Sequence, residues 1–213
     1  MFLSLLSEDV KHEIHHVGSS VFYRRNQNLM REGTVLDAVR VLDSGWVKVW
    51  ARRDGQEQIL DLLGPGTILG ELELADDQSQ LCYITALTDV RATAVQPERF
   101  KALAERNPEV YRALAHAITL KFRDEHALRM AHHGTQRLRV LLVRLADRYG
   151  RPTPDGFVHV AIPITRTLLA SWARLTTAAS GKIVTRAFGA GVQFRPDGLL
   201  IRRACLEEPD DDL

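Results

Sequence analysis

The chain is poor in cysteine and in long apolar runs. Cys82 and Cys205 are the only cysteines among 213 residues, too few and too far apart for an iron–sulfur cluster or a structural zinc site. No apolar run reaches the roughly 18 residues that span a bilayer. The opening MFLSLLSEDV lacks a preceding basic region and a following cleavage site. We therefore predict no signal peptide and a cytoplasmic, non-membrane protein with free thiols.

Positive and negative charges are unevenly distributed along the chain, although they nearly cancel to a net charge of +1. Residues 135–205 contain 12 Arg and Lys against three Asp and Glu, whereas residues 1–134 contain 16 against 19. The tail 206–213 contains five acids and no base, and we predict that it is disordered. A basic block behind a mildly acidic one indicates a nucleic-acid-binding module attached to another domain.

Short β-type runs fill residues 21–95, after a short amphipathic helix predicted over 2–16. The runs VLDAVRVLDSG, WVKVWAR, EQILDLL, YITALT and VRATAV are separated by turn signals such as Gly64-Pro65-Gly66. Many short strands at a spacing of about ten residues predict an antiparallel sandwich or barrel.

A long helix is predicted from Pro108 to about His132, with Gly134 as a hinge and another helix from Thr135 to Tyr149. Two apolar stripes coexist on the long helix. We assign one stripe to packing on the barrel: Val110, Leu114, Ile118 and Phe122. We assign the other to a homodimer seam, the alternative being a helix buried twice within its own chain: Ala113, Ala117, Leu120, Ala127 and Ala131.

The C-terminal block has the pattern of a winged helix-turn-helix. Thr165 is the predicted N-cap of a first helix, and Thr176 that of a second. Between them Arg174 stands where such a turn normally has glycine. Because a non-glycine residue at positive φ costs roughly 1–2 kcal/mol, a reshaped turn is left open. VQFRPDGLLIRR then predicts two strands around a turn at 196–198.

The order of these parts resembles the CRP/FNR family, the cyclic-AMP receptor protein and its relatives. The resemblance is carried by Gly64-Pro65-Gly66, Gly70-Glu71-Leu72, Asn107-Pro108, Arg137-Leu138 and Ile164-Thr165-Arg166. It implies an α+β protein with an N-terminal jelly-roll sensor domain (1–106), a dimerisation helix and hinge (107–134), a winged helix-turn-helix domain (135–205) and the acidic tail (206–213). It also implies a homodimer that binds a two-fold site in double-stranded DNA, with RNA polymerase as a further partner.

The effector pocket departs from the family pattern. In the nucleotide-binding members, a Glu of the Gly-Glu-Leu motif meets the ribose, and an Arg before Ser or Thr holds the phosphate. Here Gln80 and Leu81 stand at the second position, and no Lys or Arg lies between Arg53 and Arg91, a span with eight acids. A phosphodiester removed from water needs a cation or several N–H donors.

We therefore predict no tight binding of cyclic AMP and no cofactor, unless a cation comes from elsewhere in the fold or from a partner chain. The effector, if any, is left open. The pocket residues assigned from the resemblance are Gly70, Glu71, Leu72, Gln80, Leu81 and Cys82.

The second helix of the C-terminal pair has little base-reading chemistry. Where the family often has Arg, Glu and Arg, this chain has Thr177, Ala178 and Lys182, and bidentate readers of guanine or adenine are missing. The basic surface around them should bind phosphates in a salt-dependent way. We assign DNA contacts to Thr165, Arg166, Arg174, Thr176, Thr177, Ala178, Lys182 and Arg186.

Two modes of DNA binding stay open: a dimer that reads a weak, thymine-rich or shape-defined site, or a general DNA binder. The competing class is a cyclic-nucleotide or small-ligand binding module whose C-terminal domain contacts protein. An enzyme is not expected, because no nucleophile–base pair or metal constellation can be placed.

Overall fold

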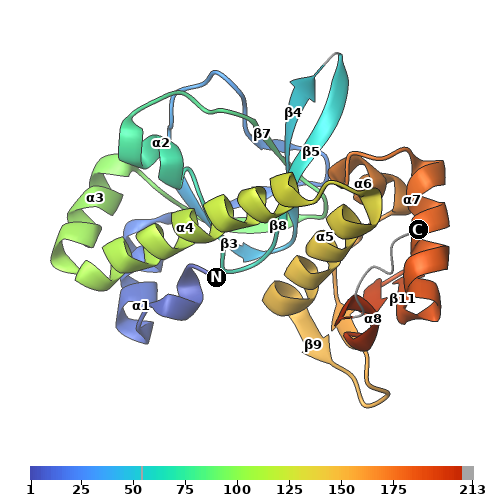
Figure 1. Ribbon diagram of the computed structural model, residues 1–213. Helices are drawn as coiled ribbons and strands as arrows, with labels where there is room; N and C mark the ends of the chain where they lie inside the picture. Colours follow the sequence, from blue (N-terminus) through green and yellow to red (C-terminus); the bar gives the residue numbers. More distant parts are fainter. Residues whose placement is uncertain (54, 208–213) are drawn as a thin grey trace. The chain divides into compact units, whose positions relative to one another are not determined.

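A computed structural model describes residues 1–53 and 55–207 (Figure 1). The chain divides into two compact units, Met1–Phe122 and Arg123–Leu213, and helix α4 (Pro108–Met130) runs from the first into the second. Within the described ranges, no helix combines the length and apolarity that a bilayer crossing requires.

The first unit is built on two four-stranded antiparallel sheets. One has the order β1-β8-β3-β6 and the other β2-β7-β4-β5. The five predicted β-type runs are confirmed as β3 (Val39–Ser44), β4 (Val47–Arg53), β5 (Gln56–Leu63), β7 (Tyr83–Ala86) and β8 (Val90–Val95). The sequence did not predict β1 (Ser19–Tyr23), β2 (Asn28–Met30) or β6 (Ile68–Leu69). β2 and β6, with three and two residues, are too short to show alternation.

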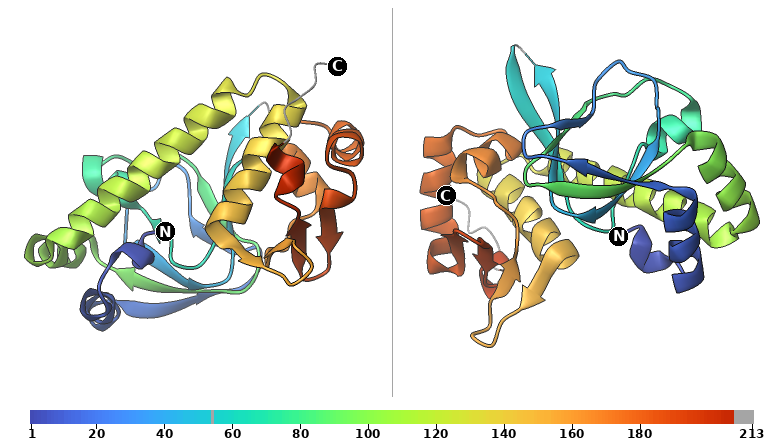
Figure 2. Two further views of the ribbon diagram at one scale, coloured as in Figure 1. Left: turned by 60° about the horizontal axis from the view of Figure 1, so that its bottom comes forward. Right: turned by 180° about the vertical axis from the view of Figure 1, so that it is seen from behind.

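Alternation along β3 divides the core of this unit into two clusters. Leu42 belongs to a cluster between the sheets that includes Val47 and Ala92. Val39 and Val41 belong to a second cluster, formed with helices on the other side of the strand. Those helices are α1 (Glu8–Val17), α3 (Pro97–Arg106) and the start of α4, and both views in Figure 2 show α1 beside α3.

Helix α4 turns a different face toward the sheets than predicted. Val110 and Ala113 are buried in the helix-side cluster, with Leu114 and Ala117 packed against it, whereas Phe122 is 72% exposed. The prediction followed steps of four residues, each of which overshoots a full turn by about 40°. Three such steps rotate Phe122 about 120° away from Val110. The assignments of Phe122 to the barrel and of Ala113 and Ala117 to the seam were therefore wrong.

The second unit contains α5 (Gly134–Tyr149), two short helices and a small sheet of order β11-β12-β10-β9. Gly134 is the first residue of α5 and His133 its N-cap, so the break between the helices lies at residues 131–133 and not at the glycine. The strands are β9 (Gly150–Pro152), β10 (Val158–Val160), β11 (Val192–Arg195) and β12 (Gly198–Ile201).

The predicted pair of short helices is present in this unit. They are α6 (Arg166–Trp172) and α7 (Thr177–Ile183), and α7 continues into a π-helical turn, Val184–Phe188. Trp172 at the end of α6 is fully buried. A last helix, α8 (Ala204–Glu207), buries Leu206. The first two residues of the predicted disordered tail are therefore helical, and 208–213 lie outside the described residues.

Candidate functional sites

The Gly-Glu-Leu motif lies where β6 ends and helix α2 (Glu71–Asp76) begins. Gly70 has a φ of +87°, and a Cβ there would come within 2.6 Å of the Leu36 side chain, so both backbone conformation and space require glycine. Glu71 is only 3% exposed, whereas Leu72 points outward. The motif therefore places one carboxylate inside the first unit.

A lysine that the sequence analysis did not assign binds this carboxylate. Lys121 of α4 donates a hydrogen bond from Nζ to Oε1 of Glu71 and forms an ion pair with it. Burial alone would lower the pKa of Lys121, but the Glu71 charge beside it raises the pKa above its usual value. Residues 54–90 contain no Lys or Arg, and the cation that pairs with Glu71 is supplied by α4 instead.

A signal for Lys121 was present in the pattern of α4. Val110, Leu114 and Ala117 form the stripe that packs toward the sheets. Position 121 continues that stripe by one more step of four residues. A lysine on a core-facing stripe needs a buried acid as its partner, although the sequence does not say which acid.

The second half of the expected effector site presents no cation. Gln80 is 4% exposed, and its backbone pairs with Gly33 and Thr34. Within the described residues its side-chain Nε2 has no hydrogen-bond partner. Leu81 is 68% exposed. Burial raises the pKa of Cys82 to about 11, so it stays a neutral thiol.

Glu73, one turn after the motif begins, adds a second buried carboxyl group. Burial raises the pKa of Glu73, and the neighbouring charge of Glu71 raises it further. The backbone N–H groups of Glu73 itself and of Leu81 act in the opposite direction and lower that pKa. A backbone donor near the expected phosphate position therefore already acts on an anion of the chain itself.

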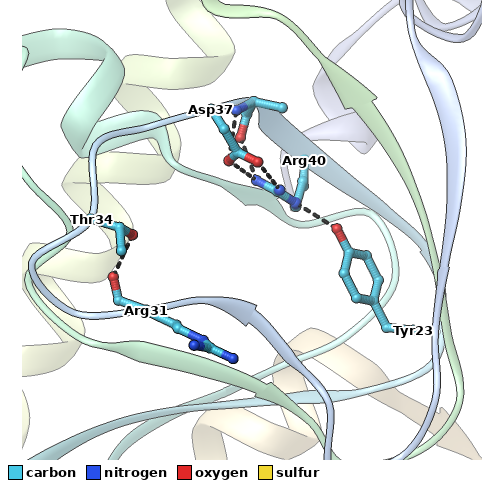
Figure 3. A network of polar contacts seen from close by, with 6 residues as sticks. Tyr23, Arg31, Thr34, Asp37 and Arg40 are labelled. Carbon is cyan, nitrogen blue, oxygen red and sulfur yellow. Dashed lines mark hydrogen bonds and ion pairs between the residues drawn. The ribbon is translucent and has the colours of Figure 1, made fainter.

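Arg40 on β3 is a further buried cation of this unit, and Figure 3 shows how it is held. Its Nε donates to the Tyr23 hydroxyl at 2.8 Å, and its two terminal nitrogens donate to the carboxylate of Asp37 at 2.9 and 2.8 Å. Nη1 also donates to the Ala38 carbonyl at 2.7 Å. Burial opposes the charge of Arg40, but these partners raise its pKa, and Arg40 in turn lowers the pKa of Asp37.

The helix pair of the second unit is capped as the sequence predicts. The Thr165 hydroxyl accepts from the Leu168 N–H at 3.1 Å, and the Thr176 hydroxyl accepts from the Ala179 N–H at 3.2 Å. Arg174 lies in the turn with a φ of +56°, so the turn keeps its left-handed conformation with arginine in place of glycine and is not reshaped. Thr165 and Thr176 therefore begin the two helices, and their hydroxyls are engaged as caps.

The outward face of α7 carries the residues predicted to meet DNA. Thr177, Ala178, Lys182 and Arg186 are exposed. On the opposite side Val184, Phe188 and Ser180 are buried.

Three of the predicted contact residues gather around one open recess. It has a volume of about 590 Å³ and is lined by Arg166, Gly181, Lys182, Thr185 and Arg186. Arg166 reaches it from α6, and its guanidinium lies 5.0 Å from the ring centroid of Phe194 on β11. Thr185 and Phe194 were not predicted as site residues, although Thr185 follows Gly181 by one step of four.

The charge around this recess is of one sign. Residues 156–196 contain Arg166, Arg174, Lys182, Arg186 and Arg195 and not one Asp or Glu. In the described part of the chain, neither Lys182 nor Arg186 has an ion-pair partner, whereas Arg174 lies 3.6 Å from a carboxylate oxygen of Glu125. A polyanion would therefore meet uncompensated charge here.

Arg137 on α5 has an internal role. Its Nε donates to the carbonyl of Ala173, just before the turn, at 2.8 Å. Its Nη1 donates to the carbonyl of His132 at 3.0 Å. Arg137 therefore joins the segment after α4 to the turn between α6 and α7.

Comparisons with known proteins agree with this arrangement. Residues 20–107 match the cyclic nucleotide-binding domain family. A CRP-like cAMP-activated global transcriptional regulator of Mycobacterium tuberculosis is 27% identical over 140 residues, which cover 64% of this chain and 62% of that protein. A cyclic AMP receptor protein of Thermus thermophilus is 30% identical over 103 residues, 48% of each chain. The chain thus matches less than two-thirds of the length of either relative.

The fold is shared with solved structures over a longer span. FixK2 from Bradyrhizobium japonicum superposes with a TM-score of 0.72 at 19% identity, covering 88% of this chain and 93% of that chain. At this identity the likeness concerns the fold.

Proposed function

We propose that this chain, a member of the CRP/FNR family, is a homodimeric, non-enzymatic transcription regulator that binds double-stranded DNA without requiring cyclic AMP. Its C-terminal part acts as a winged helix-turn-helix, with α7 in the major groove and β11–β12 as the wing. The first unit acts as a jelly-roll sensor domain.

One observation carries the DNA-binding part of the proposal. Two N-capped helices joined by a tight turn stand within a 41-residue stretch, 156–196, that has five Arg and Lys and no acid. Lys182 and Arg186 project from the outward face of the second helix. A helix of this size with exposed cations fits the major groove and the phosphates beside it.

Homodimer formation is supported by the exposed apolar stripe on α4. The stripe consists of Tyr111, Ala115, Ile118 and Phe122, spaced by four, three and four residues as in a coiled-coil seam. Tyr111 is 50% and Phe122 72% exposed. The stripe residues Tyr111, Ala115 and Ile118 also line a groove of about 450 Å³, together with Leu74 and Ala75 of α2. A second copy would bury this surface and bring two α7 helices to one two-fold site.

Independence from cyclic AMP is supported by the charges of the first unit. Gln80 and Leu81 replace the phosphate-binding pair, Lys121 already binds Glu71, and Arg40 is held by Asp37 and Tyr23. A cyclic nucleotide would have to displace these internal partners before it gained a cation. The mycobacterial relative is cAMP-activated by its description, so we propose a functional departure in this chain.

The test is selection of binding sites from random-sequence duplexes with the full chain, with and without cyclic AMP, together with calorimetric titration of cyclic AMP. We expect enrichment of a two-fold site in both conditions and no saturable nucleotide binding up to about 1 mM. Enrichment that needs cyclic AMP would contradict the proposed independence. Ligand binding without any DNA binding would favour the competing ligand-binding module with a protein-contacting C-terminal domain.

A further inference from the structure

We infer that the recess over Gly181 receives the 5-methyl group of a thymine, so that Gly181 is a specificity-determining residue of the DNA site. The inference rests on the proposed DNA-binding function. It concerns which base α7 prefers, and it can fail while DNA binding itself holds.

The outward face of α7 offers methyl groups rather than bidentate donors. Thr177 and Ala178 are exposed at the start of the helix, and neither can make the paired hydrogen bonds by which Arg reads guanine or Asn reads adenine. In the major groove, thymine is the base that presents a methyl group. Apolar contact with that methyl is the direct readout left to these side chains.

Gly181 makes this face hollow at one point. It lies one helical step of four beyond Thr177, and a Cβ added to it would meet none of the described atoms within 4 Å. The helix backbone can therefore approach the base edges more closely there than at any position with a side chain. The floor of the recess is the backbone at Gly181, and Thr185 lies one step further along.

The rim of the recess holds the helix against the DNA. Arg166, Lys182 and Arg186 line it, and no acid lies anywhere in residues 156–196. Long cationic side chains around an apolar floor can bind the two phosphate backbones while the floor meets base edges. The stacking of Arg166 on Phe194 orients one of these cations from outside the helix.

Helix stability alone would favour alanine at this position. Glycine inside a helix is less favourable than alanine by about 1 kcal/mol, and alanine would fit without a clash. Gly181→Ala therefore adds a methyl group to the recess at this position, in a protein that is at least as stable as the original. Loss of a base preference in this variant cannot be attributed to misfolding.

The experiment uses the two-fold duplex selected from random sequences, with each thymine replaced in turn by uracil, which removes only the 5-methyl group. We expect one symmetric thymine position to matter. Burial of one methyl corresponds to about fourfold in affinity per half-site, hence about 16-fold for the whole site. For Gly181→Ala the thymine-to-uracil ratio at that position should fall to about 1–2, with an unchanged or higher Tm.

Lys182→Ala is the matched control. It should weaken binding to the thymine and uracil duplexes equally and leave their ratio unchanged, because Lys182 contributes charge at the rim. A uracil effect that persists in Gly181→Ala would place methyl reading elsewhere and overturn the inference. Equal affinity of the original chain for all uracil duplexes would also overturn it, while DNA binding would still stand. Absence of any DNA binding would overturn both the inference and the proposed function.

Discussion

The two candidate sites of this chain treat charge in opposite ways. In the first unit the buried charges are matched within the chain: Lys121 binds Glu71, and Arg40 binds Asp37 and Tyr23. In the second unit Lys182 and Arg186 stand exposed, without an acidic partner in the described residues. Burial explains the difference, because a charged group removed from water is stable only when it is paired or hydrogen-bonded. A solvated charged group needs no partner within the protein and stays available to a ligand.

This contrast separates a closed site from an open one. An incoming anion in the first unit would compete with the carboxylates already bound to Lys121 and Arg40. An incoming polyanion in the second unit displaces only water and counterions from Lys182 and Arg186.

The largest effect should come from breaking the buried pair. Lys121→Met leaves the Glu71 carboxylate buried without its cation, and we expect a loss of about 2–3 kcal/mol in the free energy of unfolding, measured by urea denaturation. This is below the usual range for buried pairs because the Lys121 side chain is 29% exposed. The double variant with Glu71→Gln should recover part of the loss.

The matched control is Lys101→Met. Lys101 pairs with Asp77 at 3.2 Å on the surface, where the two side chains are 46% and 82% exposed. Its loss should change stability by less than about 0.5 kcal/mol. Similar losses for Lys121→Met and Lys101→Met would mean that the first unit does not depend on internal charge matching.

The exposed stripe on α4 provides the second prediction. Phe122→Asp places a charge in the proposed seam and should weaken dimerisation by at least about 30-fold, as for a central apolar contact worth about 2 kcal/mol. Sedimentation velocity at several concentrations measures this. Val35→Asp is the control, because Val35 is also apolar and 80% exposed but lies outside α4. An unchanged dimer in Phe122→Asp would exclude this face as the seam.

The open site predicts a difference between two cations of the second unit. Lys182→Ala should weaken DNA binding and reduce the slope of log affinity against log salt by about 0.9 per half-site, because one phosphate neutralisation is lost. Arg137→Gln should also weaken binding, because the turn between α6 and α7 loses its tie to residue 132, but with the slope unchanged. Titrations at several salt concentrations measure both. A reduced slope for Arg137→Gln would mean that Arg137 contacts phosphate directly.

The smallest effect concerns the pH dependence of stability. Burial raises the pKa of Glu73 in the folded chain, so the unfolded chain loses this proton at a lower pH. The contribution of Glu73 to stability is therefore highest in acid and declines as pH rises through the interval between the two pKa values. At pH 7, Glu73→Gln should raise Tm by about 1–3 °C.

In acid, below the usual glutamate range, the advantage of Glu73→Gln should vanish. Thermal unfolding at several pH values measures it. Glu105→Gln, an exposed position on α3, is the control and should show little change at any pH. An advantage that grows on acidification would contradict the sign of the pKa shift.

Much of the local structure could be predicted from the sequence. Five strands of the first unit, the caps Thr165 and Thr176 and the β11–β12 turn all follow from patterns that extend over a few residues. Such features depend on neighbouring residues through alternation, side-chain caps and backbone sterics, so they can be read from the chain alone.

The face of α4 could not be predicted in the same way. Both apolar stripes of this helix were visible, but the step of four residues was followed too far, and the structure instead buries Ala113 and exposes Phe122. Which stripe of α4 faces the sheets depends on the side chains against which the helix packs, such as Phe100 and Val39.

The order of elements, the basic C-terminal stretch and the shortage of cations between Arg53 and Arg91 can all be read from the sequence alone. The fold is needed to see that Lys121 pairs with Glu71 of that span. It is also needed to see that Lys182 and Arg186 have no acidic partner among the described residues. The physical reason is distance along the chain: Lys121 and Glu71 are 50 residues apart. Ion pairs form between groups that packing brings together. The sequence therefore shows which charges are present, and the fold determines whether each one pairs within the protein or stays exposed to a binding partner.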